Sequence, residues 1–377
     1  MSKTISHSAL TTYRECPRKY KEHYISRLRS PQIGSALHFG GCLDEVLNRL
    51  LGTKMDNPPE NATDNLEELK NEFDHRFAFV QIKTEIEDVR ASHFIEYYGS
   101  DFDPNLLDES DYATLGLYIK NAGYDENDPV KLYNFISDNI KKKLNVAPTD
   151  LAFYNYCSWR SMRQKAHRLL EVYAEQVMPK IKKVTSIQKK VELPDGNGTT
   201  LIGYIDLEAE FHDEVLEEFD LEGIGEITVD NKTSSPKYKL PDINDKGQLL
   251  IYDEYTGNGY GAYIVLLKKP KYTKEKTCQI CGTKTVGGER KCKVGGKDRC
   301  NGEFEVELIN PVFEFQILID KIDEEKKDLL FDEICDIMES IENEEFPENR
   351  DSCFNFGRKC QYWDLCREGS SEGLDKV

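Results

Sequence analysis

Hydrophobic residues recur along the chain with two spacings, one typical of strands and the other typical of helices. Residues 200–211 are rich in leucine, isoleucine and tyrosine, and residues 225–229 continue the same pattern, which predicts two strands. The acidic segment 212–222 between them suits an antiparallel pair. A further apolar run at 262–267 predicts another strand. These patterns place a sheet core within residues 181–270.

Helical periodicity flanks this core on both sides. An apolar face predicts a helix near the start of the chain; it consists of Leu43, Val46, Leu47, Leu50 and Leu51. The charged amphipathic segment 320–343 predicts another helix near the end. The expected class is α/β, a sheet core flanked by helices. The expected divisions are N-terminal helices at 1–52, a helical insertion at 53–180, the sheet core at 181–270, a small insertion at 271–305, and a C-terminal helix and tail at 306–377.

Candidate catalytic residues fall in and beside the predicted strands. Asp230 and Lys232 are two apart on a strand and therefore share one face. Asp206 completes a pair of carboxylates if it lies at the end of the neighbouring strand. Gln248 and Tyr252 are four apart and share one face of a following helix. Carboxylate oxygens of this kind suit Mg²⁺ or Mn²⁺ beside a phosphate.

Such a site has a definite chemistry. The metal lowers the pKa of a bound water and stabilises charge at phosphorus, while Lys232 orients the nucleophile or stabilises the anion. An isolated Asp-x-Lys is common in an acidic protein and is usually a solvated strand end. Three signals in order, two of them on predicted strands, indicate a nuclease.

These residues resemble the PD-(D/E)XK nuclease superfamily, and within it the RecB-like branch. The branch pattern G-x-x-D, D-x-K-T and Q-x-x-x-Y is matched at 203–206, 230–233 and 248–252. An opening segment S-x-S-x-L…Y-x-x-C-P-x-x-Y is matched between Ser6 and Tyr20, whereas residues from about 53 to 180 lie outside these motifs. The resemblance implies a restriction-endonuclease-like mixed sheet core.

The resemblance also implies a third metal ligand. The branch has G-x-x-x-H early in a helix, with its histidine reaching the metal, and residues 34–38 match that frame. We therefore expect His38 to join Asp206 and Asp230. Asp44 is a rival oxygen ligand that suits Mg²⁺ better by type. It lies six residues further on, so one straight helix does not aim both side chains at one ion.

Four clustered cysteines predict a structural zinc site. Cys278, Cys281, Cys292 and Cys300 have the spacing C-x2-C-x10-C-x7-C, and four thiolates suit tetrahedral Zn²⁺. The intervening sequence is rich in glycine, lysine and threonine and too poor in apolar residues to fold without a metal. We expect a small zinc ribbon inserted at 271–305.

A second cysteine group closes the chain. The resemblance implies that Cys16, Cys353, Cys360 and Cys366 hold a 4Fe–4S cluster, because RecB-like nucleases use one N-terminal and three C-terminal cysteines. The spacing C-x6-C-x5-C departs from the common family pattern, which begins C-x2-C. The alternatives are a second zinc site and unligated buried thiols.

The net charge and the cysteine content bear on how the protein could bind DNA and on the compartment we expect it to occupy. The net charge is −19, so attraction to DNA depends on a locally positive channel rather than on the whole surface. The chain starts in polar sequence without a leader pattern, and no apolar run is long enough to span a membrane. With 11 cysteines and no leader, we expect a reducing, cytoplasmic protein.

Together these patterns predict a metal-dependent DNA exonuclease. The family implies phosphodiester hydrolysis on single-stranded DNA or duplex ends, in recombination, repair or phage DNA metabolism, with a helicase or recombination protein as a possible partner. The principal alternative is a catalytically weak DNA-binding scaffold with a nuclease-like fold. A zinc-ribbon adaptor and a structural metalloprotein without nucleic acid are weaker alternatives.

Overall fold

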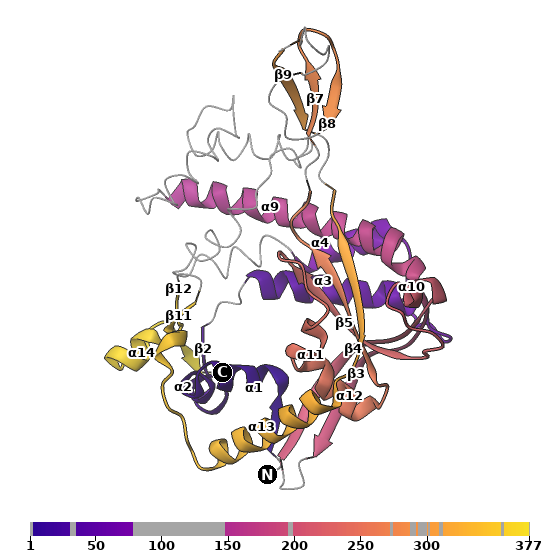
Figure 1. Ribbon diagram of the computed structural model, residues 1–377. Helices are drawn as coiled ribbons and strands as arrows, with labels where there is room; N and C mark the ends of the chain where they lie inside the picture. Colours follow the sequence, from indigo (N-terminus) through magenta and orange to yellow (C-terminus); the bar gives the residue numbers. More distant parts are fainter. Residues whose placement is uncertain are drawn as a thin grey trace.

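The computed structural model describes residues 3–30, 35–77, 148–194, 199–271, 274–286, 292, 300, 302–308, 312–355 and 358–376 (Figure 1). Its α-helices are α1 (His7–Glu15), α2 (Pro17–Tyr20), α3 (Ser35–Gly52), α4 (Leu66–Arg76), α9 (Pro148–Val172), α10 (Asp213–Glu217), α11 (Asp242–Asp245), α12 (Gln248–Thr256), α13 (Glu324–Glu342) and α14 (Trp363–Glu368). Its strands are β1 (Lys3–Ser6), β2 (Leu28–Arg29), β3 (Ile181–Pro194), β4 (Thr199–Phe211), β5 (Ile227–Ser234), β6 (Tyr260–Leu267), β7 (Lys274–Cys278), β8 (Lys284–Val286), β9 (Phe304–Leu308), β10 (Phe315–Lys321), β11 (Phe354–Asn355), β12 (Arg358–Lys359) and β13 (Asp375–Lys376).

A mixed six-stranded sheet forms the centre of the molecule. Its order is β1-β4-β5-β6-β10, and β3 pairs with β4 off this path. The predicted antiparallel pair is β4 and β5, whereas β5 and β6 run parallel. Parallel strands are normally covered on both faces, and the apolar run of β6 is accordingly buried from Gly261 to Leu267. The predicted α/β class with a mixed sheet flanked by helices, as in restriction endonucleases, is confirmed.

Helices cover both faces of this sheet. Alternate residues of β6 show the division, because Ala262, Ile264 and Leu266 belong to one hydrophobic core and Tyr263, Val265 and Leu267 to the other. The first core packs α3, α4 and α9 against the sheet, and the second packs α1, α12 and α13. The predicted apolar face of α3 lies in the first core.

The two ends of the chain come together. Ser6 caps α1 by accepting a hydrogen bond from the Ala9 amide at 3.2 Å, and the hydroxyl of Tyr13 donates to the carbonyl of Glu345 at 2.7 Å. The last strand, β13, pairs with β2 near the N-terminus. The cysteine-bearing tail with α14 therefore lies beside α2 (Figure 1).

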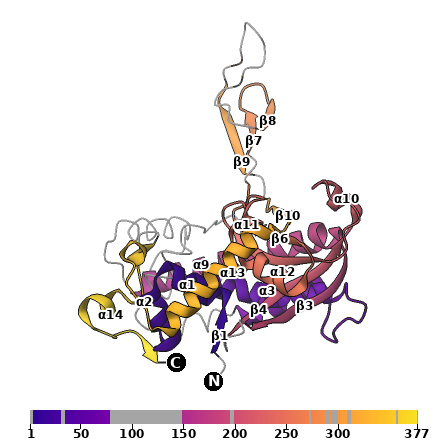
Figure 2. The same ribbon diagram turned by 60° about the horizontal axis from the view of Figure 1, so that its bottom comes forward.

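A separate three-stranded sheet projects from the body of the molecule. Its order is β8-β7-β9, and in two views it stands clear of the other described elements (Figures 1 and 2). Because β9 pairs with β7, this sheet extends to Leu308, beyond the predicted limit at residue 305. We call residues 271–308 the ribbon.

The predicted helical insertion is described only in part. Within residues 53–180, α4 and α9 are helices, and they pack against α3. Residues 78–147 of this insertion lie outside the described residues. None of the described helices combines the length and the apolar character needed to span a membrane.

Candidate functional site

The two predicted catalytic acids meet across an antiparallel ladder. Leu207 pairs with Val229, so the next step of the same register places Asp206 opposite Asp230. Directly opposed residues point to the same face of a sheet. Asp206 is held by the backbone of β5, since its Oδ2 accepts a hydrogen bond from the Asn231 amide at 3.0 Å. The pair of carboxylates predicted from the strand pattern is present.

Lys232 completes this group. Its Nζ lies 2.5 Å from Asp230 Oδ2, as expected for residues two apart on one strand. Asp230 is fully buried, whereas Lys232 keeps about a third of its side chain exposed. Burial lowers the pKa of Lys232, but Asp230 and Asp206 outweigh it, and the pKa is raised overall. The ammonium group is therefore charged and fixed beside the acids.

The surroundings of Asp230 disfavour the anionic form of its carboxyl group. Burial, reinforced by nearby Asp206 and opposed by Lys232, raises its pKa to about 7. Two carboxylates that share a site repel one another, and a cation between them relieves that repulsion. The geometry thus favours a bound cation at this position.

Gln248 and Tyr252 support the acids from α12. Gln248 Nε2 donates to Asp230 Oδ1 at 3.0 Å and lies 2.9 Å from the hydroxyl oxygen of Tyr252. That hydroxyl donates to the carbonyl of Tyr204 at 2.7 Å. The helical spacing of four therefore links α12 to both catalytic strands, and Gln248 positions Asp230.

The structure explains the glycine of the G-x-x-D motif, because there is little room for a side chain at Gly203. A Cβ atom at Gly203 would lie 3.0 Å from Cε1 of Tyr252, which is tighter than most real Cβ contacts, so the ring would have to shift. We expect Gly203→Ala to displace the Tyr252 ring and lower the free energy of unfolding by about 1–3 kcal/mol, the usual cost of overpacking. Urea unfolding measures this change. Gly225→Ala is the control because nothing lies within 4 Å of its added Cβ; equal losses in both variants would contradict the explanation.

A cleft of about 280 Å³ opens beside these residues. Its polar lining comes from Asp44 on α3, Asp206 on β4, and Asn231, Lys232 and Thr233 on β5. Burial, and next the charge of Asp206, raises the pKa of Asp44 to about 6. Asp44 thus faces Asp206 across the cleft, and a third carboxylate joins the two strand acids.

His38 has different surroundings. It is absent from the cleft lining, its ring stacks on Phe77 with centroids 5.4 Å apart, and it lies 3.8 Å from Cys42 Sγ. Six residues of helix separate His38 from Asp44, so the two side chains point in different directions. The structure brings Asp44, rather than His38, to the strand acids.

Three polar residues at the site were not found from the sequence. Tyr173 donates to Asn231 Oδ1 at 3.0 Å, while Asn231 Nδ2 is buried without a hydrogen-bond partner. Gln188 has a φ of 51° within β3 and donates to Asp44 Oδ2 at 3.0 Å. Asn231 was detectable as the middle residue of Asp-x-Lys, on the opposite strand face from the acid. Gln188 and Tyr173 carry no motif.

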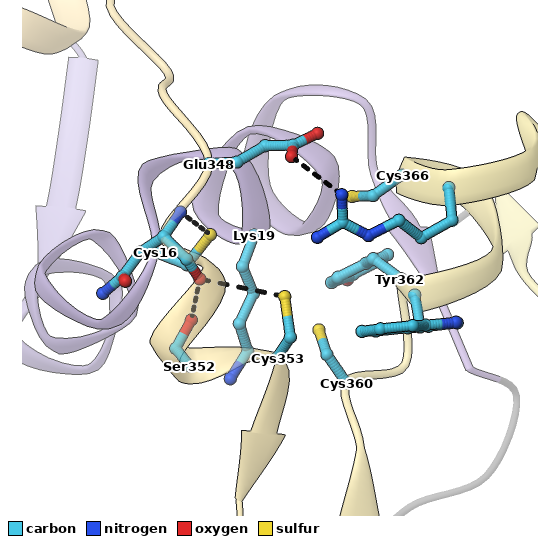
Figure 3. Close-up of a pocket in the computed structure, with 11 residues that line it drawn as sticks. Cys16, Lys19, Glu348, Ser352, Cys353, Cys360, Tyr362 and Cys366 are labelled. Atoms are coloured by element: carbon cyan, nitrogen blue, oxygen red, sulfur yellow. Dashed lines mark hydrogen bonds and ion pairs between the residues drawn. The ribbon is translucent and has the colours of Figure 1, made fainter.

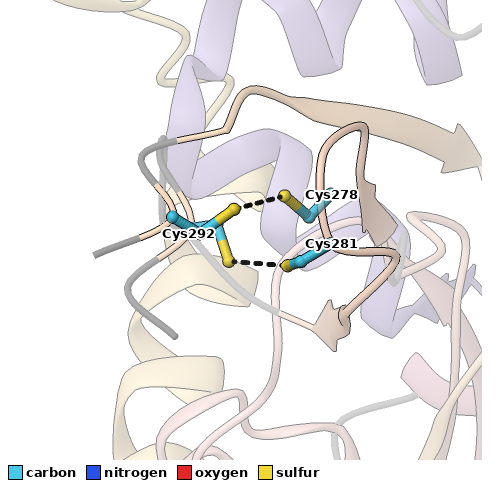
Figure 4. Close-up of side chains that lie close together, drawn as sticks. Cys278, Cys281 and Cys292 are labelled. Carbon is cyan, nitrogen blue, oxygen red and sulfur yellow. Dashed lines mark hydrogen bonds between the residues drawn. The ribbon is translucent and has the colours of Figure 1, made fainter. Parts of the chain in front are cut away.

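The four ribbon cysteines converge. Their sulfurs all lie within 4.8 Å of one another; Cys278 Sγ is 3.5 Å from Cys300 Sγ, and Cys281 Sγ is 3.6 Å from Cys292 Sγ (Figure 4). Gly302 permits this approach, because a Cβ there would lie 2.6 Å from Cys278 Sγ. This cluster is able to hold a metal ion.

Four cysteines outside the ribbon line one pocket. Cys16 comes from the junction of α1 and α2, and Cys353, Cys360 and Cys366 come from the C-terminal tail (Figure 3). Backbone hydrogen bonds fix the tail, including one from the Cys360 amide to the Cys353 carbonyl at 2.8 Å. Burial raises the pKa of the Cys360 thiol, and the neighbouring thiols add to the shift. The predicted grouping of both chain ends is therefore present.

Comparison with known proteins bears on the first part of the chain. A family model of the PD-(D/E)XK nuclease superfamily matches residues 4–108. This superfamily match includes Cys16, His38 and Asp44 and ends before the acids of β4 and β5. Searches of curated proteins and of solved structures found no match. The match and the mixed sheet support a metal-dependent nuclease.

Proposed function

We propose that this protein is a metal-dependent DNA exonuclease that hydrolyses phosphodiester bonds. The observation that carries the proposal is the placement of Asp206 opposite Asp230, with Lys232 2.5 Å from Asp230, beside an open cleft. This group borders a cavity of about 280 Å³, which is large enough for a phosphate. The superfamily match supports the same reaction class.

The carboxylates of Asp44, Asp206 and Asp230 fit a divalent cation. All three are oxygen ligands, and burial, with the charge of Asp206 as a further cause, raises the pKa values of Asp44 and Asp230, so a bound cation would stabilise their anionic forms. They are spaced more widely than the ribbon sulfurs, which suits Mg²⁺ or Mn²⁺ because these ions keep several waters. The bound ion supplies an activated water and neutralises charge at the phosphate.

The remaining side chains have complementary roles. Lys232 holds a positive charge at the cleft surface, where it orients the attacking water or stabilises the pentacovalent phosphate. Gln248 fixes one oxygen of Asp230, and Tyr252 fixes Gln248 against β4. The unpartnered amide nitrogen of Asn231 is a further donor beside the cleft.

The exonuclease activity is proposed from the RecB-like motifs. The matched opening segment, the D-x-K-T and Q-x-x-x-Y motifs and the joined chain ends are typical of that branch, which acts on DNA ends or single strands. A helicase or recombination protein is the partner class that this branch implies.

Zn²⁺ is proposed for the ribbon cysteines and a 4Fe–4S cluster for Cys16, Cys353, Cys360 and Cys366. Zinc–thiolate bonds of about 2.3 Å in a tetrahedron separate the sulfurs by about 3.8 Å, close to the 3.5 and 3.6 Å found in the ribbon. Among the described residues, the ribbon sulfurs are the group that converges within 4.8 Å. The second cysteine group is spread more widely around its pocket, which favours a multinuclear cluster over a second zinc ion.

The roles of Asp44 and His38 in metal binding can be distinguished by experiment. We expect Asp44→Asn to weaken Mn²⁺ binding, measured by calorimetry without DNA, about 10-fold or more, because one charged ligand is lost. His38→Ala removes a ring that contacts Phe77 and Cys42 and leaves Mn²⁺ affinity nearly unchanged. A larger loss of Mn²⁺ affinity in His38→Ala would restore the histidine as the ligand.

The function itself is tested by cleavage of end-labelled DNA. Protein purified without oxygen is incubated with single-stranded and duplex substrates, with Mg²⁺, with Mn²⁺ and with neither. Metal-dependent loss of terminal nucleotides supports an exonuclease, and internal cuts would replace it by an endonuclease. Tight DNA binding without any cleavage would favour the scaffold alternative.

A further inference from the structure

Part of the wall of the cleft comes from one stripe of α3. Leu37, Gly40, Gly41 and Asp44 all line the cleft. The last three follow Leu37 by three, four and seven residues, and residues with this spacing share one face of a helix. At a rise of about 1.5 Å per residue, Leu37 lies about 10 Å along the helix from Asp44. The stripe therefore leads away from the three acids, with the two glycines between a carboxylate and an apolar side chain.

The two glycines are not required by the packing of the described residues. A Cβ atom at Gly41 would meet nothing within 4 Å, and one at Gly40 would lie 4.0 Å from Oγ1 of Thr233, an ordinary contact. Both glycines lie inside α3, and neither has a positive φ. Glycine within a helix is less stable than alanine, because it loses more conformational freedom on folding. The space left by the missing side chains belongs to the cleft.

Leu37 gives the outer end of the stripe an apolar surface. Its side chain is 74% exposed and lines the same cleft as the acids. Carboxylates that hold a cation have no use for an exposed leucine, whereas a nucleotide presents both a phosphate and the apolar faces of a base. The wall of the cleft thus changes from charged to apolar along α3, as the parts of a nucleotide do.

Asn231 indicates a ligand independently of α3. It lines the cleft from β5, and its Nδ2 is buried without a hydrogen-bond partner, while Tyr173 occupies its Oδ1. Buried polar groups are normally hydrogen-bonded, and a ligand in the cleft can supply the acceptor. A phosphate or sugar oxygen is an acceptor of this kind.

The size of the cleft limits what it can hold. Its volume is about 280 Å³. Pockets that enclose drug-sized molecules have volumes of about 300–1,000 Å³, so this cleft has room for about one nucleotide and not for a base pair.

We propose that Leu37, Gly40 and Gly41 form the subsite for the nucleotide next to the scissile phosphate. The sugar of this nucleotide lies over the two glycines, and its base packs on Leu37. The nucleotide is held unpaired, because the cleft has no room for a partner base. This inference rests on the proposed nuclease function and names the residues that determine which DNA end enters the site.

Gly41→Leu tests the space over the glycines, because leucine forms helices better than glycine and would occupy the open position. We expect a higher urea midpoint and unchanged Mn²⁺ affinity, but affinity for single-stranded DNA lower by about 10-fold or more. Gly41→Ala should give a smaller loss in the same direction. Binding is measured by fluorescence anisotropy with Mn²⁺ and an oligothymidylate of about eight nucleotides, in a Lys232→Ala background that slows cleavage.

Leu37→Ala tests the apolar contact. We expect it to weaken binding of the same oligothymidylate by about 10-fold, because the leucine would be covered by a base. Leu329→Ala is the matched control, since Leu329 is 63% exposed on α13 and is not part of the cleft lining. The control should bind the single strand as the background protein does. A blunt duplex of the same length should bind more weakly than the single strand to the background protein.

Unchanged single-strand affinity in Gly41→Leu would overturn the proposal. A lower urea midpoint in that variant would also overturn it, because the glycine would then serve the fold. Equal weakening in Leu37→Ala and Leu329→Ala would remove Leu37 from the subsite, and equal affinity for duplex and single strand would contradict an unpaired nucleotide. These affinities are read without cleavage, so failure of the nuclease proposal would appear separately in the cleavage assay.

Discussion

Lys232→Ala is expected to reduce metal-dependent DNA cleavage by a factor on the order of 10³, the scale of removing one group that stabilises a transition-state anion. The lysine is the cation that lies 2.5 Å from Asp230 and also lines the cleft. Without it, the buried Asp230 carboxyl takes up a proton near neutral pH, because burial already raises its pKa to about 7. Single-turnover cleavage of end-labelled DNA at pH 7.5 and excess Mg²⁺ measures the effect.

Lys189→Ala is the matched control. Lys189 forms the same kind of pair with a buried carboxylate, since its Nζ lies 2.7 Å from Oε2 of Glu208, but it is not part of the cleft lining. We expect a comparable loss of stability in urea unfolding and nearly unchanged cleavage. If Lys232→Ala retains activity, or if Lys189→Ala loses as much, the catalytic assignment of Lys232 is wrong.

Cys360→Ser is expected to remove the brown colour and the visible charge-transfer absorbance of a 4Fe–4S cluster and to lower the free energy of unfolding on the order of 4 kcal/mol. The cluster would link Cys16 to the C-terminal tail, which closes a loop spanning most of the chain, and links across long loops constrain the unfolded state most. Anaerobic absorbance spectra, iron content and urea unfolding measure these changes.

Cys335→Ser provides the comparison. This cysteine is exposed on α13 and belongs to neither cysteine group, so its replacement should leave colour and stability unchanged. A colourless wild-type protein with two zinc ions per chain would exclude the iron–sulfur assignment, and a full cluster in Cys360→Ser would exclude Cys360 as a ligand.

Much of the site was predictable because its geometry is local. Two-residue alternation placed Asp230 and Lys232 together, and the strand pattern placed Asp206 on the neighbouring antiparallel strand. The spacing of four on a helix linked Gln248 to Tyr252. In each case the separation along the chain is short, or one turn or ladder step relates the two residues, so backbone periodicity alone determines which side chains meet.

The third carboxylate was not predictable in this way. The motif frame favoured His38, whereas the structure turns Asp44 toward Asp206 and His38 toward Phe77. The rotation of α3 about its axis is set by burial of its apolar face, including Leu43 and Leu47, against α4, α9 and the sheet. A sequence periodicity defines that face but not the position of the catalytic acids relative to it.

The sequence by itself determined the α/β class, the strand acids with their lysine, and the ribbon cysteines, because periodicity and ligand spacing follow from local backbone geometry. The grouping of Cys16 with the C-terminal cysteines was implied by the family resemblance, and the joined chain ends bring these residues to one pocket. Tertiary structure decided that Asp44 faces the acids and that Gln188, Tyr173 and Asn231 surround them. These relations depend on how helices pack and strands register across long separations in the chain, and packing energy, not local propensity, sets them.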